Sequence, residues 1–145
     1  MARLFVAAAG CALVLVAPAC SSGPEKVDYA REFPRALPRK ETLDIQVFRQ
    51  SQEIEFTNTT ARSFGPSTLW LNGRFSRPID GLAVGETLKF RLRDFRDQYG
   101  DPFREGGFFA TEKPEKLVLA QLETPDGGGN PIMLGLIVVG TESDE

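Results

Sequence analysis

Histidine is absent from the 145 residues of this chain. Its absence removes the usual general base, the commonest metal ligand and every Ser-His or Cys-His nucleophile pair. Cysteine occurs only twice, as Cys11 and Cys20. No disulfide can therefore form within the chain beyond position 20, and the stability of that part must come from packing. Most of the familiar hydrolase mechanisms and a disulfide scaffold are therefore excluded.

Neither sign of charge dominates the chain, because 17 basic and 20 acidic side chains give a formal net charge of −3. Nucleic-acid binding depends on clustered Lys and Arg that neutralise phosphates, so no nucleic-acid partner is expected. The length has room for one domain with one hydrophobic core. Eleven Phe supply core material, while 14 Gly and 10 Pro supply the turns of a loop-rich β protein.

The N-terminus has the order of an export signal. A basic start at 1–3 precedes an apolar run at 4–16, and an Ala-Pro-Ala triplet at 17–19 stands directly before Cys20. This arrangement resembles a bacterial lipoprotein leader, in which the cysteine receives a diacylglyceryl group and becomes the mature N-terminus. The resemblance implies a signal peptide over 1–19 and a lipid anchor on Cys20, in a bacterial membrane facing the periplasm. Ser21 after the cysteine favours the outer membrane.

Two other interpretations of the leader stay open. The triplet at 17–19 also fits the A-x-A pattern of an ordinary secretory cleavage site. The apolar stretch from Leu4 to Cys20 has 17 residues, barely enough to span a bilayer as an uncleaved anchor.

The segment after the leader is expected to be a lipid-anchored tether over 20–42. It contains Pro24, Pro34 and Pro38 and no sustained period of two or 3.6 residues. The alternative is that residues 29–33 form a helical turn or pack on the domain. An acidic tail at 141–145 is expected to fray.

Residues 43–140 carry the alternation of antiparallel strands. Asn72-Gly73 is expected to form a type I′ turn between two strands. Further strands are predicted at 43–48, 53–57, 86–93, 116–123 and 131–139. Asp94 is expected to cap a helical turn through Tyr99.

About seven strands, with Trp70 on a middle one, predict an all-β fold, an Ig-like antiparallel β-sandwich. The run from Glu53 to Glu123 is also similar to the small Ig-like modules of bacterial envelope proteins. The stretches that carry this similarity are FTNTT at 56–60, LNG at 71–73, LAVGE at 82–86 and DFRDQYG at 94–100. The resemblance implies no catalytic residues.

Four acidic residues fall within twelve positions, namely Asp94, Asp97, Asp101 and Glu105. Oxygen ligands on a loop suit Ca²⁺, but the spacing is not that of an EF-hand. Arginines at 93, 96 and 104 are interleaved with the acids, which favours mutual neutralisation on a solvated loop. A second cluster, Lys89, Arg91 and Arg93, predicts a solvated strand face that discourages edge pairing; the alternative is a site for an anion or a lipid headgroup.

Trp70 and the pair Phe108-Phe109 are the aromatic residues whose burial the sequence leaves open. A two-residue turn at Asn72-Gly73 would place Trp70 opposite Phe75, so we expect both to face the core. Leu69 and Leu71 would then be covered by the tether or a loop. The alternative is an exposed indole that stacks on a sugar ring. Phe108 and Phe109 follow two glycines, and we expect them to tuck into the core rather than to form a mobile apolar tip for a partner.

The sequence thus predicts a non-catalytic, lipid-anchored envelope lipoprotein that binds or scaffolds a protein or polysaccharide, with no metal or cofactor. Two alternatives are retained. One is a small envelope enzyme that uses the carboxylates Asp94, Asp97 and Asp101, and the other is a carbohydrate-binding module.

Overall fold

The computed structural model describes residues 29–140, which form an all-β domain. Its seven strands confirm the expected number: β1 (Arg39–Gln50), β2 (Glu53–Thr57), β3 (Ser67–Leu71), β4 (Phe75–Ile79), β5 (Thr87–Arg91), β6 (Ala120–Pro125) and β7 (Pro131–Val139). One 3₁₀ turn, η1 (Leu92–Asp94), follows β5. Within this part of the chain no helix is long and apolar enough to cross a membrane.

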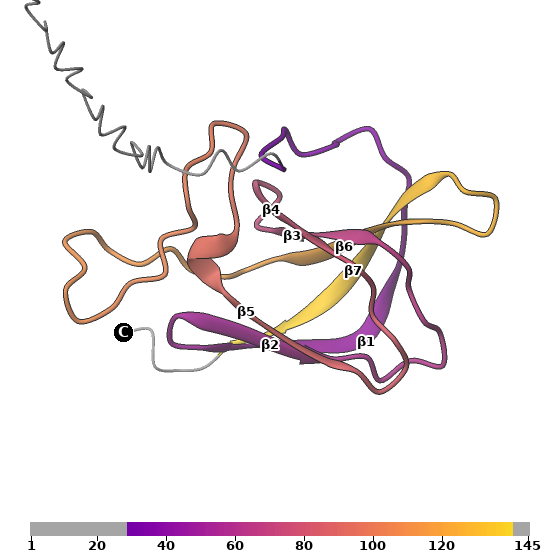
Figure 1. The fold of residues 1–145 in the computed structure, drawn as a ribbon, viewed down its shortest axis with the longest axis horizontal. Helices are drawn as coiled ribbons and strands as arrows, with labels where there is room; N and C mark the ends of the chain where they lie inside the picture. Colours follow the sequence, from indigo (N-terminus) through magenta and orange to yellow (C-terminus); the bar gives the residue numbers. More distant parts are fainter. Residues whose placement is uncertain (1–28, 141–145) are drawn as a thin grey trace, which may run out of the picture.

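The strands form one continuous mixed sheet in the order β4-β3-β6-β7-β1-β2-β5, curled into a half-barrel (Figure 1). Neighbouring strands of residues 29–140 pair antiparallel, except that β1 and β7 are parallel. Hydrogen bonding therefore runs from one edge strand to the other without a break. Two separate sheets, as in an Ig-like sandwich, are not observed.

The core fills the concave side of the sheet. In β1 every second residue from Leu43 to Arg49 is buried, which is the period of two that puts alternate side chains on one face. The buried apolar residues of this main core include Ile45, Ile54, Phe56, Leu69, Leu71, Phe75, Leu92, Phe95, Phe103, Leu122 and Leu134. Together they make one contiguous cluster that reaches every strand except β5, whose Leu88 and Phe90 pack against its rim.

The Asn72-Gly73 turn forms as predicted but changes the strand register. Both residues have positive φ, at 54° and 60°, and the Arg74 N–H donates to the Leu71 carbonyl at 3.0 Å. A two-residue connection would pair Leu71 with Arg74. The strands instead pair Leu71 with Phe75, so the connection has three residues, with Arg74 as the third. A shift of one residue moves every side chain of a strand to the opposite face.

Trp70 is consequently buried on the outer face of the sheet, not in the main core. It lies opposite Ser76, while Phe75 shares the inner face with Leu69 and Leu71. The prediction that Trp70 is a buried residue is confirmed, since its exposed fraction is 0%. The prediction that Trp70 and Phe75 share one face is wrong, and an exposed indole platform for sugars is contradicted too.

The N-terminal segment 29–38 covers Trp70. The Phe33 ring meets the indole edge to face, with ring centroids 5.2 Å apart, and Met133 and Leu37 complete this second small cluster. The Arg31 guanidinium lies 4.8 Å from the indole centroid. Residues 29–38 are therefore part of the domain, and the expected tether over 20–42 is too long. β1 also begins at Arg39, four residues before the predicted strand start at Leu43.

Polar contacts hold the same segment in place. The indole Nε1 donates to a Glu123 carboxylate oxygen at 2.7 Å, and the Arg31 guanidinium pairs with the same oxygen at 2.5 Å. The Met133 N–H donates to the Pro38 carbonyl at 2.9 Å. Because the outer face of β3 is apolar at Trp70, this segment shields the indole from water.

We predict that Trp70→Ala lowers the free energy of unfolding by ~3–5 kcal/mol, since a large buried side chain is lost and a cavity remains. Urea denaturation followed by far-UV circular dichroism measures the change. Trp70→Phe, which keeps an aromatic ring but lacks the Nε1–H donor, should lose less. An unchanged unfolding midpoint for Trp70→Ala would mean that the N-terminal segment does not hold the ring.

Candidate functional site

The predicted lipidation site, Cys20, lies outside the described residues, as do the signal peptide over 1–19 and the acidic tail at 141–145. The structure therefore places the candidates within the domain: the acidic residues from Asp94 to Glu105, the cationic row on β5 and the Phe108-Phe109 loop.

The acidic residues do not converge on one site. Three of them each face a different arginine: Asp94 with Arg77 at 3.2 Å, Asp97 with Arg74 at 2.7 Å, and Glu105 with Arg91 at 3.8 Å. These three acids are neutralised, but the predicted arrangement is wrong: the partners come from β4, β5 and the β3–β4 turn, none is Arg93, Arg96 or Arg104, and Asp97 is buried instead of solvated. Residues 29–140 contain no group of three side chains placed to hold a metal ion.

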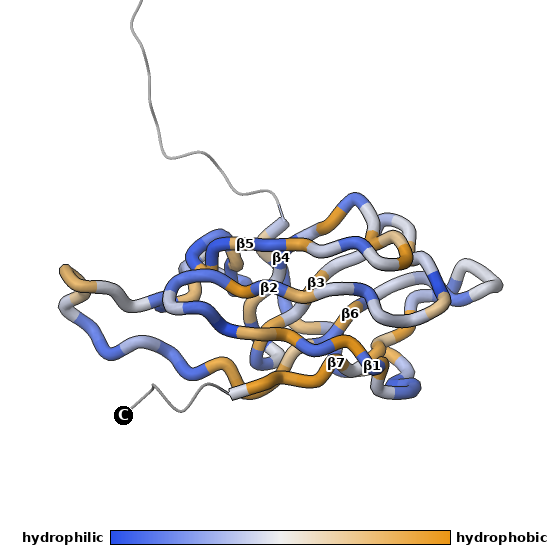
Figure 2. The backbone as a smooth tube through the Cα atoms, turned by 90° about the horizontal axis from the view of Figure 1, so that it is seen from below, coloured by the Kyte–Doolittle hydropathy of each residue, from blue (hydrophilic) through white to orange (hydrophobic). Residues whose placement is uncertain are grey.

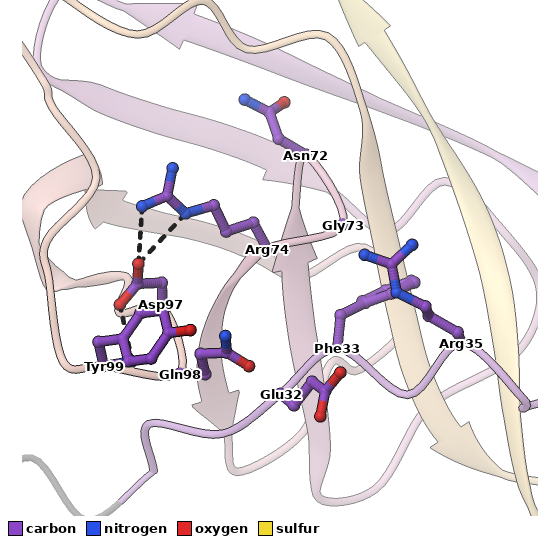
Figure 3. A pocket seen from close by; sticks show the side chains of 9 residues that line it. All are labelled: Glu32, Phe33, Arg35, Asn72, Gly73, Arg74, Asp97, Gln98 and Tyr99. Carbon is purple, nitrogen blue, oxygen red and sulfur yellow. Dashed lines mark hydrogen bonds and ion pairs between the residues drawn. The ribbon is translucent and has the colours of Figure 1, made fainter.

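Asp97 is the most organised of these groups. It is 1% exposed, and its Oδ2 accepts hydrogen bonds from Arg74 Nε at 3.2 Å and Nη2 at 2.7 Å (Figure 3). Its Oδ1 accepts the backbone N–H groups of Tyr99 and Asp101, both at 2.9 Å. These bonds shape a tight loop at 97–101. The expected helical turn from Asp94 to Tyr99 is wrong, since the 3₁₀ turn precedes it at Leu92–Asp94.

The electrostatics of Asp97 suit a structural anion. Burial by itself would raise the pKa of this carboxyl, but the Arg74 guanidinium and the backbone N–H groups of Asp101 and Tyr99 outweigh burial and lower the pKa below its ordinary 3.8. The hydrogen bond to Asp97 likewise raises the pKa of Arg74. A carboxyl that acts as a general acid at neutral pH needs a raised pKa. Asp97 has the opposite shift.

A polar cleft of about 320 Å³ opens beside this ion pair. Figure 3 shows Arg74 and Asp97 on one side and Phe33 and Arg35 on the other. The cleft is lined by Glu32, Phe33, Arg35, Asn72, Gly73, Arg74, Asp97, Gln98 and Tyr99. The Asn72 side chain is occupied, because its amide donates to the Lys116 carbonyl and its oxygen accepts the Val118 N–H. The cleft therefore presents hydrogen-bonding groups but no nucleophile beside a base.

A larger groove of about 500 Å³ lies where the half-barrel stays open, between the edge strands β4 and β5. Its apolar lining comes from Phe64, Ile79, Leu82, Leu88 and Phe90, with Asp80 and Glu86 also among its residues. The Arg77 guanidinium crosses the groove and lies 4.4 Å from the Phe90 ring centroid. Pro78 in β4 fits an edge position, because proline has no N–H to donate to a neighbouring strand.

Of the predicted cationic row, Lys89 and Arg91 are exposed on the edge strand β5, whereas Arg93 lies in η1, so the three residues do not share one strand. Lys89 lies 3.4 Å from Glu53 and 3.7 Å from Glu55, both on β2, and all three side chains remain largely accessible. Such exposed pairs contribute little stability each. Their position on an end strand discourages the pairing of another chain along this edge.

Arg49 is the functional residue that the sequence interpretation missed. It is 7% exposed, and its guanidinium donates to the carbonyls of Ser51 at 3.1 Å, Glu105 at 3.0 Å and Glu115 at 2.5 Å. Glu105 and Glu115 stand at the two ends of one loop, so Arg49 clasps its neck. The inward alternation of β1, which continues from Val47 to position 49, is the signal that predicts its burial.

The clasped loop presents Phe108 and Phe109 to solvent, with exposed fractions of 95% and 90%. The prediction that these rings tuck into the core is wrong. Gly106 and Gly107 have φ of 78° and 132°, values that favour glycine and turn the chain outward. The core beneath is already filled by Phe103, which packs on Phe75.

No protein-family model, no curated protein and no solved structure matches this chain. The candidate sites therefore stand on their own geometry.

We predict that Asp97→Asn lowers the free energy of unfolding by ~1.5–3 kcal/mol at neutral pH, the usual effect of losing hydrogen bonds to a charged group. Since the folded pKa of Asp97 lies below 3.8, its stabilisation is present above 3.8 and is lost as the pH falls through the folded value. The two proteins should therefore converge in acid, as measured by urea denaturation across pH. Asp44→Asn, an exposed carboxylate, is the control. A gap that stays constant into acid would contradict the assignment.

We predict that Arg49→Met destabilises the domain by ~2–3 kcal/mol, because the carbonyls in the loop neck lose a charged donor. Amide hydrogen exchange should accelerate most at residues 104–115. Arg62→Met removes an exposed ion pair with Glu41 and should change little. Equal exchange in the two variants would show that Arg49 does not hold the loop.

Proposed function

We propose that this chain is a non-catalytic lipoprotein of the bacterial cell envelope, anchored by lipid on Cys20, whose β domain binds or scaffolds another envelope component. The observation that carries the proposal is the apolar run at 4–16 followed by the small triplet at 17–19 and Cys20. Each buried CH₂ contributes ~0.8 kcal/mol, so two or more acyl chains hold a protein stably on a membrane. In lipoproteins of double-membraned bacteria a serine after the lipidated cysteine favours the outer membrane, so the proposal includes an outer-membrane anchor that faces the periplasm.

The start of the domain limits its distance from the lipid. Tyr29 is the first described residue and already makes contacts, with its hydroxyl donating to the Asp94 carbonyl. Nine positions separate it from Cys20, which even in a fully extended chain span about 30 Å. On this proposal the domain works close to the membrane surface.

The groove between β4 and β5 is the binding site that we assign to this function. It combines an apolar lining with charged groups and lies between two strand edges. Main-chain pairing is restricted at both edges, because Pro78 has no N–H, Ser76 already pairs with Arg96 and β5 carries exposed charges, so a partner would bind mainly by placing apolar side chains in the groove. A protein segment therefore suits this groove better than a polysaccharide does.

The alternative of an envelope enzyme that uses Asp94, Asp97 and Asp101 has no observation in its favour. Both oxygens of Asp97 are occupied by hydrogen bonds, and Asp94 is paired with Arg77.

We predict that the mature protein begins at Cys20, carries a diacylglyceryl group and fractionates with the membrane. Intact-mass analysis of the full chain expressed in a double-membraned bacterium measures this directly. Cys20→Ser should abolish the lipid mass and release or mislocalise the domain. Cys11→Ser is the matched control, since it changes the other leader cysteine. An unmodified Cys20 at the N-terminus of a soluble protein would refute the proposal.

A further inference from the structure

The loop at 104–115 projects from the end of the half-barrel that carries η1 (Figures 1 and 2). At its tip the rings of Phe108 and Phe109 meet edge to face, with centroids 5.0 Å apart. They are the two most exposed large apolar side chains among residues 29–140. The six residues from 106 to 111 carry no charge. Moving this tip into an apolar medium would therefore desolvate no charged group.

The loop is held in this shape by specific contacts. Arg49 clasps the carbonyls of Glu105 and Glu115, and the Glu115 N–H donates to the Arg104 carbonyl at 2.9 Å across the neck. The Gln52 amide donates to the Gly106 carbonyl at 2.9 Å. Burying a guanidinium costs free energy unless its hydrogen bonds are made. Here the bonds are made to the loop neck, and they hold the loop in a shape that leaves both rings exposed to solvent.

The neck lies beside the point where the chain enters the domain. The Tyr29 hydroxyl binds the carbonyl of Asp94 in η1, and the Arg93 N–H of the same turn donates to the Glu105 carboxylate at 3.3 Å. The first described residue and the loop neck thus contact one three-residue element. A link of at most about 30 Å between Cys20 and Tyr29 is long enough to let this end of the domain reach the lipid surface.

We infer that Phe108 and Phe109 insert into the interfacial layer of the bilayer that holds Cys20, which gives the domain a second attachment and fixes its orientation. The inference rests on the proposed lipid anchor. Phe is among the residues that interfacial segments bury at the boundary between headgroups and acyl chains, and the anchor makes the insertion of two rings an intramolecular event. Insertion at this end leaves the β4–β5 groove accessible to a partner along the length of the half-barrel.

The experiment uses the absence of other free thiols in the mature lipoprotein, where Cys11 is removed and Cys20 is acylated. Ala110→Cys places one thiol on the exposed tip while both rings stay in place. The purified full-length lipoprotein is labelled there with a polarity-sensitive fluorophore and reconstituted into phosphatidylethanolamine and phosphatidylglycerol vesicles. Quenching by spin-labelled lipid and by aqueous iodide then reports the depth of the tip.

Val84→Cys is the matched control, because Val84 is also exposed and precedes β5, at the opposite end of that strand from η1. We expect lipid quenching at position 110 to exceed that at position 84 several-fold, with iodide showing the reverse. Adding Phe108→Ser and Phe109→Ser to Ala110→Cys should bring the tip to the control value without changing the melting temperature, since neither ring is buried.

The outcomes separate the inference from the proposed function. A lipid mass on Cys20 together with equal quenching at positions 110 and 84 overturns the inserted tip and leaves the anchor standing. A Cys20 without lipid overturns both. Quenching at position 110 that survives the double serine substitution also overturns the assignment of insertion to Phe108 and Phe109.

Discussion

Parallel pairing between β1 and β7 joins the two halves of this domain. Strands β4, β3, β6 and β7 form one antiparallel half, and β1, β2 and β5 form the other. Close approach is needed where the halves meet, since a Cβ on Gly135 would lie 2.6 Å from Thr42 Oγ1. The long strand β1 pairs with β7 along most of its length and with β2 at its C-terminal end. The continuous curl, the single inner core and the open edge between β4 and β5 all follow from this junction.

Two buried charges shape the loops at one end of the half-barrel. Asp97 gathers the backbone of 97–101, and Arg49 clasps the neck of 104–115. Each is stabilising only because its hydrogen-bonding groups are satisfied, since an unpaired charge in the same place would be strongly destabilising. These two ionisable residues organise loops, and the loop at 104–115 carries the tip for which membrane insertion is proposed.

The packing of residues 29–38 onto the sheet shortens the chain that would link the domain to a membrane. A tether that extended to position 42 would let the body rotate and stand clear of the headgroups. Phe33 and Leu37 instead bring the chain onto the outer face of the sheet, where they cover Trp70. If Cys20 carries the proposed lipid, the link to the domain is shorter than the sequence alone predicts, and the projecting aromatic tip would be held near the bilayer.

The sequence by itself determined the class of fold and the positions of most strands, because these depend on local alternation and turn chemistry. Asn72-Gly73 specifies its turn through two positive φ angles, and the pattern of β1 specifies which residues face inward. It did not determine the face of Trp70, because one additional residue at Arg74 reverses the register and Trp70 is flanked by Leu69 and Leu71. It also did not determine the partners of Asp94, Asp97 and Glu105, the exposure of Phe108 and Phe109, or the β1–β7 junction. These depend on contacts between residues far apart in the chain, which only the tertiary structure brings together.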